Sequence, residues 1–160
     1  MSLPEDLDEL ARAVLDGNRY LTLGTTEDDH RPRLSPVYFT HVGYRTFYWV
    51  SSPDARHSKN VAARPEVAIV IFDSSVEIGE GRAVYIDAAA SLVPDEELPQ
   101  RCSEAFADAD PGAVRFQPHQ LSGDAPLRLY RADATGWEVH LPGRDPRNVT
   151  GIDIRRRVTP

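Results

Sequence analysis

The chain has 160 residues, of which 18 are Lys or Arg and 25 are Asp or Glu, so its formal net charge is -7. With 41% hydrophobic residues, this composition is typical of a soluble globular chain, and the length predicts one domain with a sizeable core. The acidic balance disfavours nucleic-acid binding, the apolar runs are too short to cross a membrane, and the lone Cys102 favours a reducing cytoplasm.

The first part of the chain predicts a helix followed by three strands. Ser2-Leu3-Pro4-Glu5 has the pattern of a capping box, and apolar residues then recur at helical spacing up to Gly17, which we expect in a left-handed conformation. Runs rich in aromatic and β-branched residues predict strands at 20–25, 32–42 and 46–51. A short helix over 57–63 follows and is closed by Pro65.

The second part predicts further strands around one more helix. Strands are expected at 66–73 and 82–93, and a helix at 95–107. The Pro- and Gly-containing stretch 108–126 is predicted to be a loop with one helical turn, and it suggests no function. Residues 127–132 and 136–141 are predicted to form a hairpin, and the polar end with Arg155-Arg156-Arg157 a mobile tail.

Short strands with two flanking helices and no regular strand-helix alternation indicate a mainly antiparallel barrel or sandwich. The glycine fingerprint of dinucleotide-binding parallel sheets is accordingly absent. Gly79-Glu80-Gly81 lacks the third glycine and precedes a strand, so it is interpreted as a turn.

Residues suited to binding a phosphate gather in two stretches. Arg33 and Ser35 are two apart on a strand, so their side chains leave the same face. Downstream, Ser51 and Ser52 end a strand, and His57-Ser58-Lys59 opens a short helix. Free N–H groups at a helix start, hydroxyl donors and a cation together favour a phosphate. The alternative is that Ser58 only caps the helix, Lys59 is a solvated surface residue and His57 an exposed loop residue.

The basic residues are divided unevenly, because 17 are Arg and Lys59 is the only Lys. A compact ammonium group acts as a point charge, whereas a guanidinium group is a planar fork. The single Lys therefore stands where an ammonium group at a helix start would meet a phosphate.

Three stretches of this sequence resemble the pyridoxamine 5'-phosphate oxidase-like family, the FMN-binding split barrels. They are Arg-Leu-Ser-Pro-Val-Tyr-Phe at 33–39, Phe-Tyr-Trp-Val-Ser-Ser at 47–52 and His-Ser-Lys-Asn-Val-Ala-Ala-Arg-Pro-Glu-Val-Ala at 57–68. The resemblance implies a six-stranded antiparallel split β-barrel with flanking helices that pairs as a homodimer. It also implies that FMN, or in some branches the deazaflavin F420 or haem, lies between the subunits.

Carried over by position, the resemblance implies a set of cofactor-binding residues. Arg33 and Ser35 would flank the cofactor, and Val37 would pack near its ring. Ser51 and Ser52 would lie near the phosphate or ribityl chain, and Ser58 and Lys59 on the phosphate. Trp137 would lie over the cofactor of the partner chain, and the alternative is that it only packs at an edge or interface. No protein nucleophile is implied, because the flavin itself transfers the electrons, and the catalytic residues stay unknown.

Two departures separate this chain from the biosynthetic vitamin B6 oxidase. Tyr38 stands where that enzyme has a Lys, and Arg144-Asp145-Pro146-Arg147 matches its substrate-binding block poorly. We therefore expect an FMN-dependent oxidoreductase acting on an unidentified small molecule, with a nicotinamide cofactor or oxygen as the other electron partner. The alternatives are an F420-dependent reductase of the same fold and a ligand-binding protein without turnover.

The expected layout is one domain with four parts: an N-terminal helix (1–17), a barrel core (18–93), a helix and loop (94–126), and a C-terminal hairpin and tail (127–160). No metal site is expected, because the five histidines never fall at an i, i+4 ligand spacing. A serine hydrolase elbow, Gly-x-Ser-x-Gly, is also absent.

Overall fold

A computed structural model describes residues 6–160. The N-terminal helix α1 runs over Leu7–Asp16, and its N-cap is Asp6, whose carboxylate accepts the backbone N–H of Asp8 at 3.1 Å. The predicted capping box at 2–5 lies outside the described residues. Gly17 ends the helix as expected, but its φ is -80°, so the left-handed prediction is wrong. A Cβ there would lie 2.9 Å from the carbonyl oxygen of Ala13, so close backbone approach is what favours glycine.

Within residues 6–160, eight strands form one sheet in which every paired neighbour is antiparallel. The order across the sheet is β2-β1-β5-β6-β7-β4-β3, and β8 pairs with β7. The prediction of a mainly antiparallel β fold with flanking helices is therefore confirmed. The strands are β1 (Tyr20–Thr26), β2 (Pro32–Tyr38), β3 (Thr40–Val42), β4 (Thr46–Ser51), β5 (Glu66–Phe72), β6 (Ala83–Leu92), β7 (Arg128–Leu141) and β8 (Ile154–Val158).

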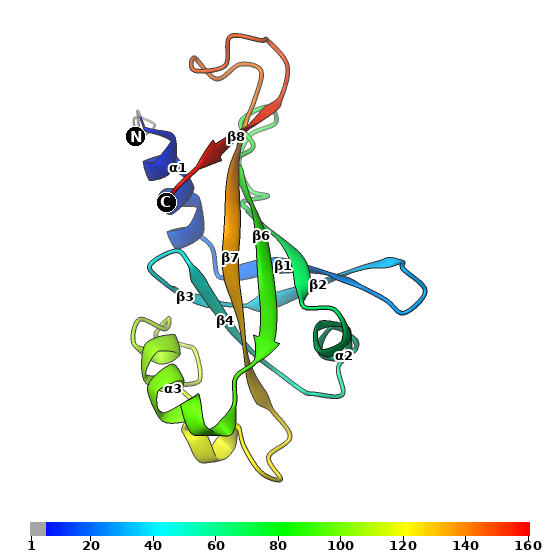
Figure 1. The fold of residues 1–160 in the computed structure, drawn as a ribbon. Coiled ribbons are helices and arrows are strands. Elements are labelled where there is room, and N and C mark those ends of the chain that lie inside the picture. The colour runs from blue at the N-terminus through cyan, green and yellow to red at the C-terminus, as the bar shows by residue number, and fades with distance from the viewer. Residues whose placement is uncertain (1–5) are drawn as a thin grey trace.

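The strand predicted at 32–42 bends at Phe39 and is divided into β2 and β3. Its first part, β2, pairs with β1 at one end of the sheet order, and its second part, β3, pairs with β4 at the other end. This division curls the sheet toward a barrel, with β1 and β2 running across β6 and β7 (Figure 1). The division adds one strand to the predicted six, and β8 at the end of the chain adds another.

The predicted hairpin of 127–132 and 136–141 is wrong, because these residues form the single strand β7. Asp133-Ala134-Thr135-Gly136 contains residues typical of turns, but β6 pairs with β7 on both sides of it. The extra residue is absorbed as a bulge, where the Thr135 hydroxyl donates to the carbonyl oxygen of Asp87 at 3.1 Å. Tertiary pairing overrides the local turn signal.

The end of the chain is also a strand and not a tail. Arg155, Arg156 and Arg157 lie on β8, which pairs with the second half of β7. The connection between these strands is fixed by Asp145, whose carboxylate is fully buried. Arg147 Nη2 lies 2.6 Å and Arg82 Nη2 lies 3.8 Å from it. These two guanidinium contacts, Arg147 foremost, hold the pKa of Asp145 at about 2.

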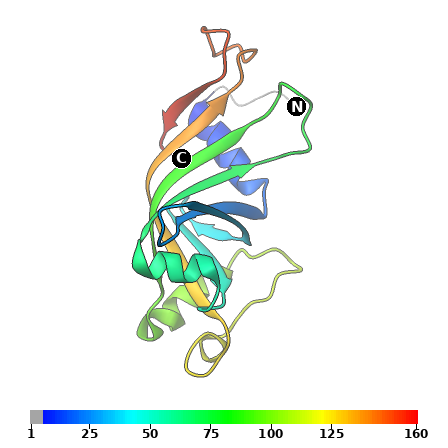
Figure 2. The same cartoon turned by 90° about the vertical axis from the view of Figure 1, so that its right-hand side faces the viewer.

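Two helices cover different parts of the sheet (Figures 1 and 2). Helix α2 (Arg56–Ala63) follows β4 and packs on β1, where the Asn60 amide donates to the Thr25 hydroxyl at 3.0 Å. The helix predicted at 95–107 consists of a 3-10 turn, η1 (Asp95–Glu97), and α3 (Leu98–Phe106). The following loop contains one further turn, η2 (Pro118–Gln120), as predicted.

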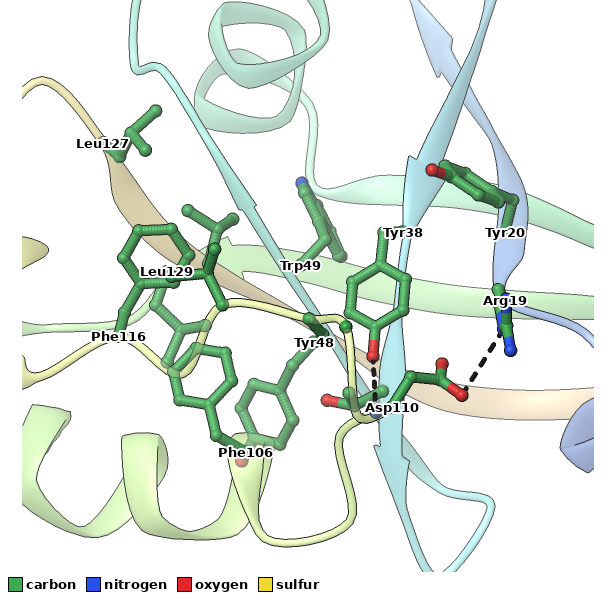
Figure 3. Close-up of a pocket in the computed structure, with 15 residues that line it drawn as sticks. Arg19, Tyr20, Tyr38, Tyr48, Trp49, Phe106, Asp110, Phe116, Leu127 and Leu129 are labelled. Atoms are coloured by element: carbon green, nitrogen blue, oxygen red, sulfur yellow. Dashed lines mark hydrogen bonds and ion pairs between the residues drawn. The ribbon is translucent and has the colours of Figure 1, made fainter.

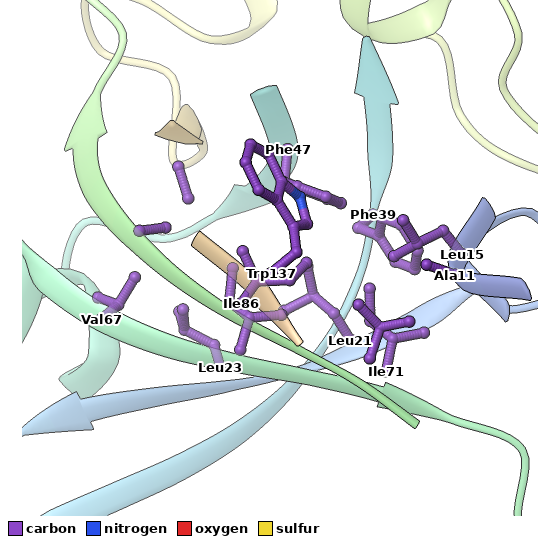
Figure 4. Close-up of a cluster of buried hydrophobic side chains, with 14 of the residues drawn as sticks. Ala11, Leu15, Leu21, Leu23, Phe39, Phe47, Val67, Ile71, Ile86 and Trp137 are labelled. Carbon is purple, nitrogen blue, oxygen red and sulfur yellow. The ribbon is translucent and has the colours of Figure 1, made fainter. Parts of the chain in front are cut away.

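The apolar side chains form two clusters. The larger one fills the inside of the curled sheet under α1 and includes Leu15, Leu23, Phe47, Ile86 and Trp137 (Figure 4). The smaller one lies under α3 and includes Tyr48, Cys102 and Leu129. No helix within residues 6–160 is long and apolar enough to span a bilayer.

Candidate functional site

The N-terminus of α2 lies just after the end of β4 and has no side-chain cap. After Ser51, the hydroxyl oxygen of Ser52 accepts the backbone N–H of Asp54 at 3.1 Å, and the carbonyl of Ser52 accepts that of Ala55. This turn leads into Ala55, the N-cap, whose backbone is extended and which provides no side-chain hydrogen bond to the helix. The N–H groups of the first turn therefore lack the usual cap and favour an anion.

Ser58 lies in that first turn and is 3% exposed. Its hydroxyl has no hydrogen-bond partner in the structure. The alternative interpretation, in which Ser58 caps the helix, is therefore wrong. A buried polar group without a partner costs about 1–3 kcal/mol, so such groups are rare unless a ligand or water completes them.

Two arginines near the start of α2, Arg33 and Arg56, contact the same carboxylate. Glu27, directly after β1, has a side chain that is 11% exposed and contacts Arg33 on β2. Its other oxygen, Oε2, lies 3.5 Å from Nη1 of Arg56 in α2. Glu27 therefore ties β2 to the start of α2. Sequence reasoning missed it, because Glu27 looks like part of a polar turn.

His57 belongs to this cluster and is not the exposed loop residue favoured from the sequence. It lies within α2, and its Nε2 is 2.8 Å from the hydroxyl oxygen of Ser51. Burial, with a smaller contribution from the charge of Arg33, lowers the pKa of His57. The imidazole is thus biased toward its neutral form.

Lys59 stands at the rim of the cluster. Its side chain is 62% exposed, and its Nζ lies 3.8 Å from Oδ1 of Asp54. Such an exposed pair contributes little to stability, so the ammonium group can turn toward an anion at the helix start with small loss.

The structure places the remaining predicted residues farther from α2. Ser35 and Val37 follow Arg33 on the same face of β2, where Val37 packs against the larger core cluster. Trp137 lies on β7 within that core, and its indole N–H donates to the carbonyl oxygen of Tyr44 at 3.0 Å. Within one chain, therefore, Arg33, Ser51, Ser52, Ser58 and Lys59 surround the start of α2, and Trp137 does not.

A cavity of about 530 Å³ lies beside β4. Trp49 and Val50 of β4 line it, so it begins one residue before Ser51. The loop after α3, to which the sequence assigned no function, forms a wall with Asp110, Ala113 and Phe116. Figure 3 shows Tyr38 and Arg19 beside Asp110, whose backbone N–H donates to the Tyr38 hydroxyl oxygen at 3.2 Å.

The floor of this cavity is fixed to α3 by a polar network. The Tyr48 hydroxyl donates to Glu104 at 2.9 Å, and Arg101 contacts the same carboxylate oxygen at 3.2 Å. Burial and the bond to Glu104 raise the pKa of Tyr48 to about 12, so the phenol stays protonated.

The sequence model of the pyridoxamine 5'-phosphate oxidase family matches residues 7–141. The chain belongs to this family. The match includes β1 to β7, and with the curled antiparallel sheet it confirms the split-barrel fold. Among curated protein sequences, none matches the chain.

Several solved structures share the fold at low identity. A haem-binding protein from Mycobacterium smegmatis superposes with a TM-score of 0.69 and 16% identity, over 98% of this chain and 60% of that one. The haem storage protein HutZ from Vibrio cholerae gives 0.62 and 20%, over 87% and 96%. An FAD-binding protein from Mesorhizobium loti gives 0.60 and 21%, over 81% and 90%. These similarities establish the fold alone.

Proposed function

We propose that this chain binds FMN, with the phosphate at the N-terminus of α2, and acts as a flavin-dependent oxidoreductase on a small molecule. The observation that carries the proposal is the buried hydroxyl of Ser58, which has no partner and lies in an uncapped first turn. A phosphate oxygen supplies the acceptor that this hydroxyl and the N–H groups beside it need.

The charges around the helix start fit a phosphate. Arg33, Arg56 and Lys59 provide three cations, and Glu27 and Asp54 provide two carboxylates. A phosphate would compete with these carboxylates for the cations, so the cluster is already neutralised in part before a ligand binds. Such a pre-formed cluster is stable without the cofactor and still leaves excess positive charge for it.

Each residue would have a separate task. Ser58 and the first-turn N–H groups would bind phosphate oxygens, Lys59 and Arg33 would supply charge, and Ser51 and Ser52 would contact the adjoining chain of the cofactor. Ser35 and Val37 would flank the cofactor along β2. When bound, FMN supplies the capacity to accept and return a hydride, and the protein binds, orients and shields the reactants.

The proposal includes a homodimer. Large apolar side chains stand exposed on neighbouring strands of the sheet, among them Tyr20 (63%), Leu34 (70%) and Phe72 (50%). Exposed apolar groups gathered in this way are typical of association surfaces. Trp137 lines a surface hollow of about 680 Å³ beside β6 and β8, and in the dimer we assign it to the cofactor of the partner chain.

Haem is a competing cofactor, since structures with this fold include haem-binding proteins. Haem iron is held mainly by His, Cys, Met or Tyr. The residues lining the cavity beside β4 include no His, Cys or Met. Of its tyrosines, Tyr48 is bonded to Glu104 and Tyr38 to the backbone of Asp110, while Tyr20 lies exposed at the border. His41, in the adjoining hollow, is paired with Asp16. The phosphate-type cluster therefore favours a flavin.

Parallel titrations of the purified, ligand-free protein with FMN, riboflavin, F420 and hemin test the proposal. Riboflavin is the matched control, because it lacks only the phosphate. We expect a shifted visible spectrum and quenched fluorescence with FMN, and at least ~100-fold weaker binding of riboflavin, equivalent to about two charge-assisted hydrogen bonds. Equal affinities for FMN and riboflavin would contradict a phosphate-binding site at the N-terminus of α2.

The remaining outcomes separate the rival functions. Preference for F420 would indicate a deazaflavin-dependent reductase, and tight hemin binding with no response to flavins would indicate a haem protein. Mixing the FMN complex with NADH or NADPH without oxygen should bleach the flavin absorbance. Tight FMN binding without reduction by any donor would indicate a binding protein.

A further inference from the structure

The cavity beside β4 has walls suited to a flat apolar molecule. Its volume of about 530 Å³ falls within the range of small-molecule sites. Aromatic side chains come from three different parts of the chain, β1–β2, β4 and the end of α3 with the loop that follows it, and surround the cavity in Figure 3. They are Tyr20, Tyr38, Tyr48, Trp49, Phe106 and Phe116.

Two of its lining residues carry polar atoms that nothing in the structure satisfies. Trp49 is 2% exposed, and its indole Nε1 has no hydrogen-bond partner. The hydroxyl of Thr40 is likewise buried and without a partner. Because buried donors are nearly always paired, we expect a water molecule or the π face of a bound ring to meet these groups at the border of the cavity.

A second hollow of about 330 Å³ continues from the cavity and shares Tyr38, Thr40 and Asp110 with it. Asp16, Glu104 and Asp108 also line this hollow, and no Lys or Arg is among its lining residues. Arg19 and Arg101 neutralise Asp110 and Glu104 from outside. Asp16 lies 3.0 Å from Nε2 of His41 and accepts the Tyr44 hydroxyl at 2.8 Å, and both of these partners also line the hollow. Asp108 has no cationic partner among the described residues, so its carboxylate, with that of Asp16, leaves this end of the combined space negative.

We propose that the cavity binds the flat apolar body of a substrate that carries a protonated amine, with the amine in the acidic hollow. The inference rests on the proposed function in one respect, that the cavity serves the same reaction as the cofactor cluster beside it. Its charge pattern disfavours a phosphorylated substrate such as pyridoxamine 5'-phosphate, because a phosphate would face Asp16 and Asp108 in place of a cation.

The test uses three probes of the same shape on the full chain without flavin: naphthalen-1-ylmethylamine, the corresponding alcohol and naphthalene-1-carboxylate. In calorimetric titrations the amine should bind ~3–10-fold more tightly than the alcohol, as expected for partly exposed charges, and the carboxylate should bind most weakly. The preference for the amine should shrink as salt is added. Equal affinities, or preference for the carboxylate, would overturn the amine assignment.

Two variants locate the probes. Ala113→Trp fills the cavity and should weaken all three probes by at least ~10-fold, whereas Ala62→Trp, on the exposed side of α2, should not. Asp108→Asn, at an exposed position, should lower the affinity for the amine by ~3-fold and leave the affinities for the other two probes unchanged. Asp124→Asn, elsewhere on the surface, should change none of the three affinities. Full amine affinity in a folded Ala113→Trp protein would overturn the location. Because no flavin is present, these outcomes are independent of FMN binding.

Discussion

Replacing Ser58 with alanine should change stability and cofactor affinity in opposite directions. In the ligand-free protein the buried hydroxyl has no partner, so its removal relieves a cost of about 1–3 kcal/mol, and alanine also favours the helix. We expect the free energy of unfolding to rise by about 1 kcal/mol. FMN should bind ~10–100-fold more weakly, because one hydrogen bond to a charged group is lost.

Urea unfolding followed by circular dichroism measures the first effect, and quenching of flavin fluorescence the second. Ser103→Ala is the matched control, since Ser103 is an exposed serine in α3 and reports helix propensity alone. Riboflavin affinity should not change in either variant. If Ser58→Ala destabilises the ligand-free protein and binds FMN as well as the wild type does, the hydroxyl is structural and the phosphate assignment fails.

Three further predictions concern charge. Lys59→Glu should weaken FMN at least ~10-fold and leave riboflavin affinity and the Tm of the ligand-free protein unchanged, because the ammonium group is exposed; unchanged FMN affinity would exclude Lys59 from the site. Asp145→Asn should lower the free energy of unfolding by about 2 kcal/mol near neutral pH, since the folded pKa of about 2 lies below the ordinary 3.8. That difference should vanish as pH falls from about 4 to 2 in urea titrations, and a difference independent of pH would contradict the ion-pair argument. The lowered pKa of His57 reduces the free energy of unfolding as pH falls below about 6.5, with the full loss reached below the folded pKa. His57→Gln should therefore make the free energy of unfolding less dependent on pH in this range. Identical pH profiles for the wild type and the variant would show that the pKa of His57 is not perturbed.

Local patterns predicted most elements, because strand and helix periodicity survive folding where apolar faces are buried. They failed at 133–136, where turn-forming residues lie inside β7 and pairing with β6 overrides them. The division of the 32–42 strand at Phe39 could not be predicted either. Both parts have the residue pattern of a strand, and only their pairing with different strands, β1 and β4, separates them.

The candidate site divides in the same way. The stretch 51–59 was found because its residues are adjacent in the chain, and Arg33 joins it through the family resemblance. Glu27 was missed because its neighbours are turn residues, and its meaning comes only from contacts with β2 and α2. The cavity was missed for a similar reason, since its walls come from segments far apart in the sequence.

Strand β8 has a consequence for how the molecule behaves at high concentration. It covers the half of β7 that β4 leaves unpaired, and it presents three consecutive arginines along its length. Strand β2, which begins the strand order, contains Pro32 and Pro36, which lack N–H donors. The charge on β8, the missing donors on β2 and the short length of the third edge strand, β3, each oppose the addition of a foreign strand, so the sheet resists growth into fibrils.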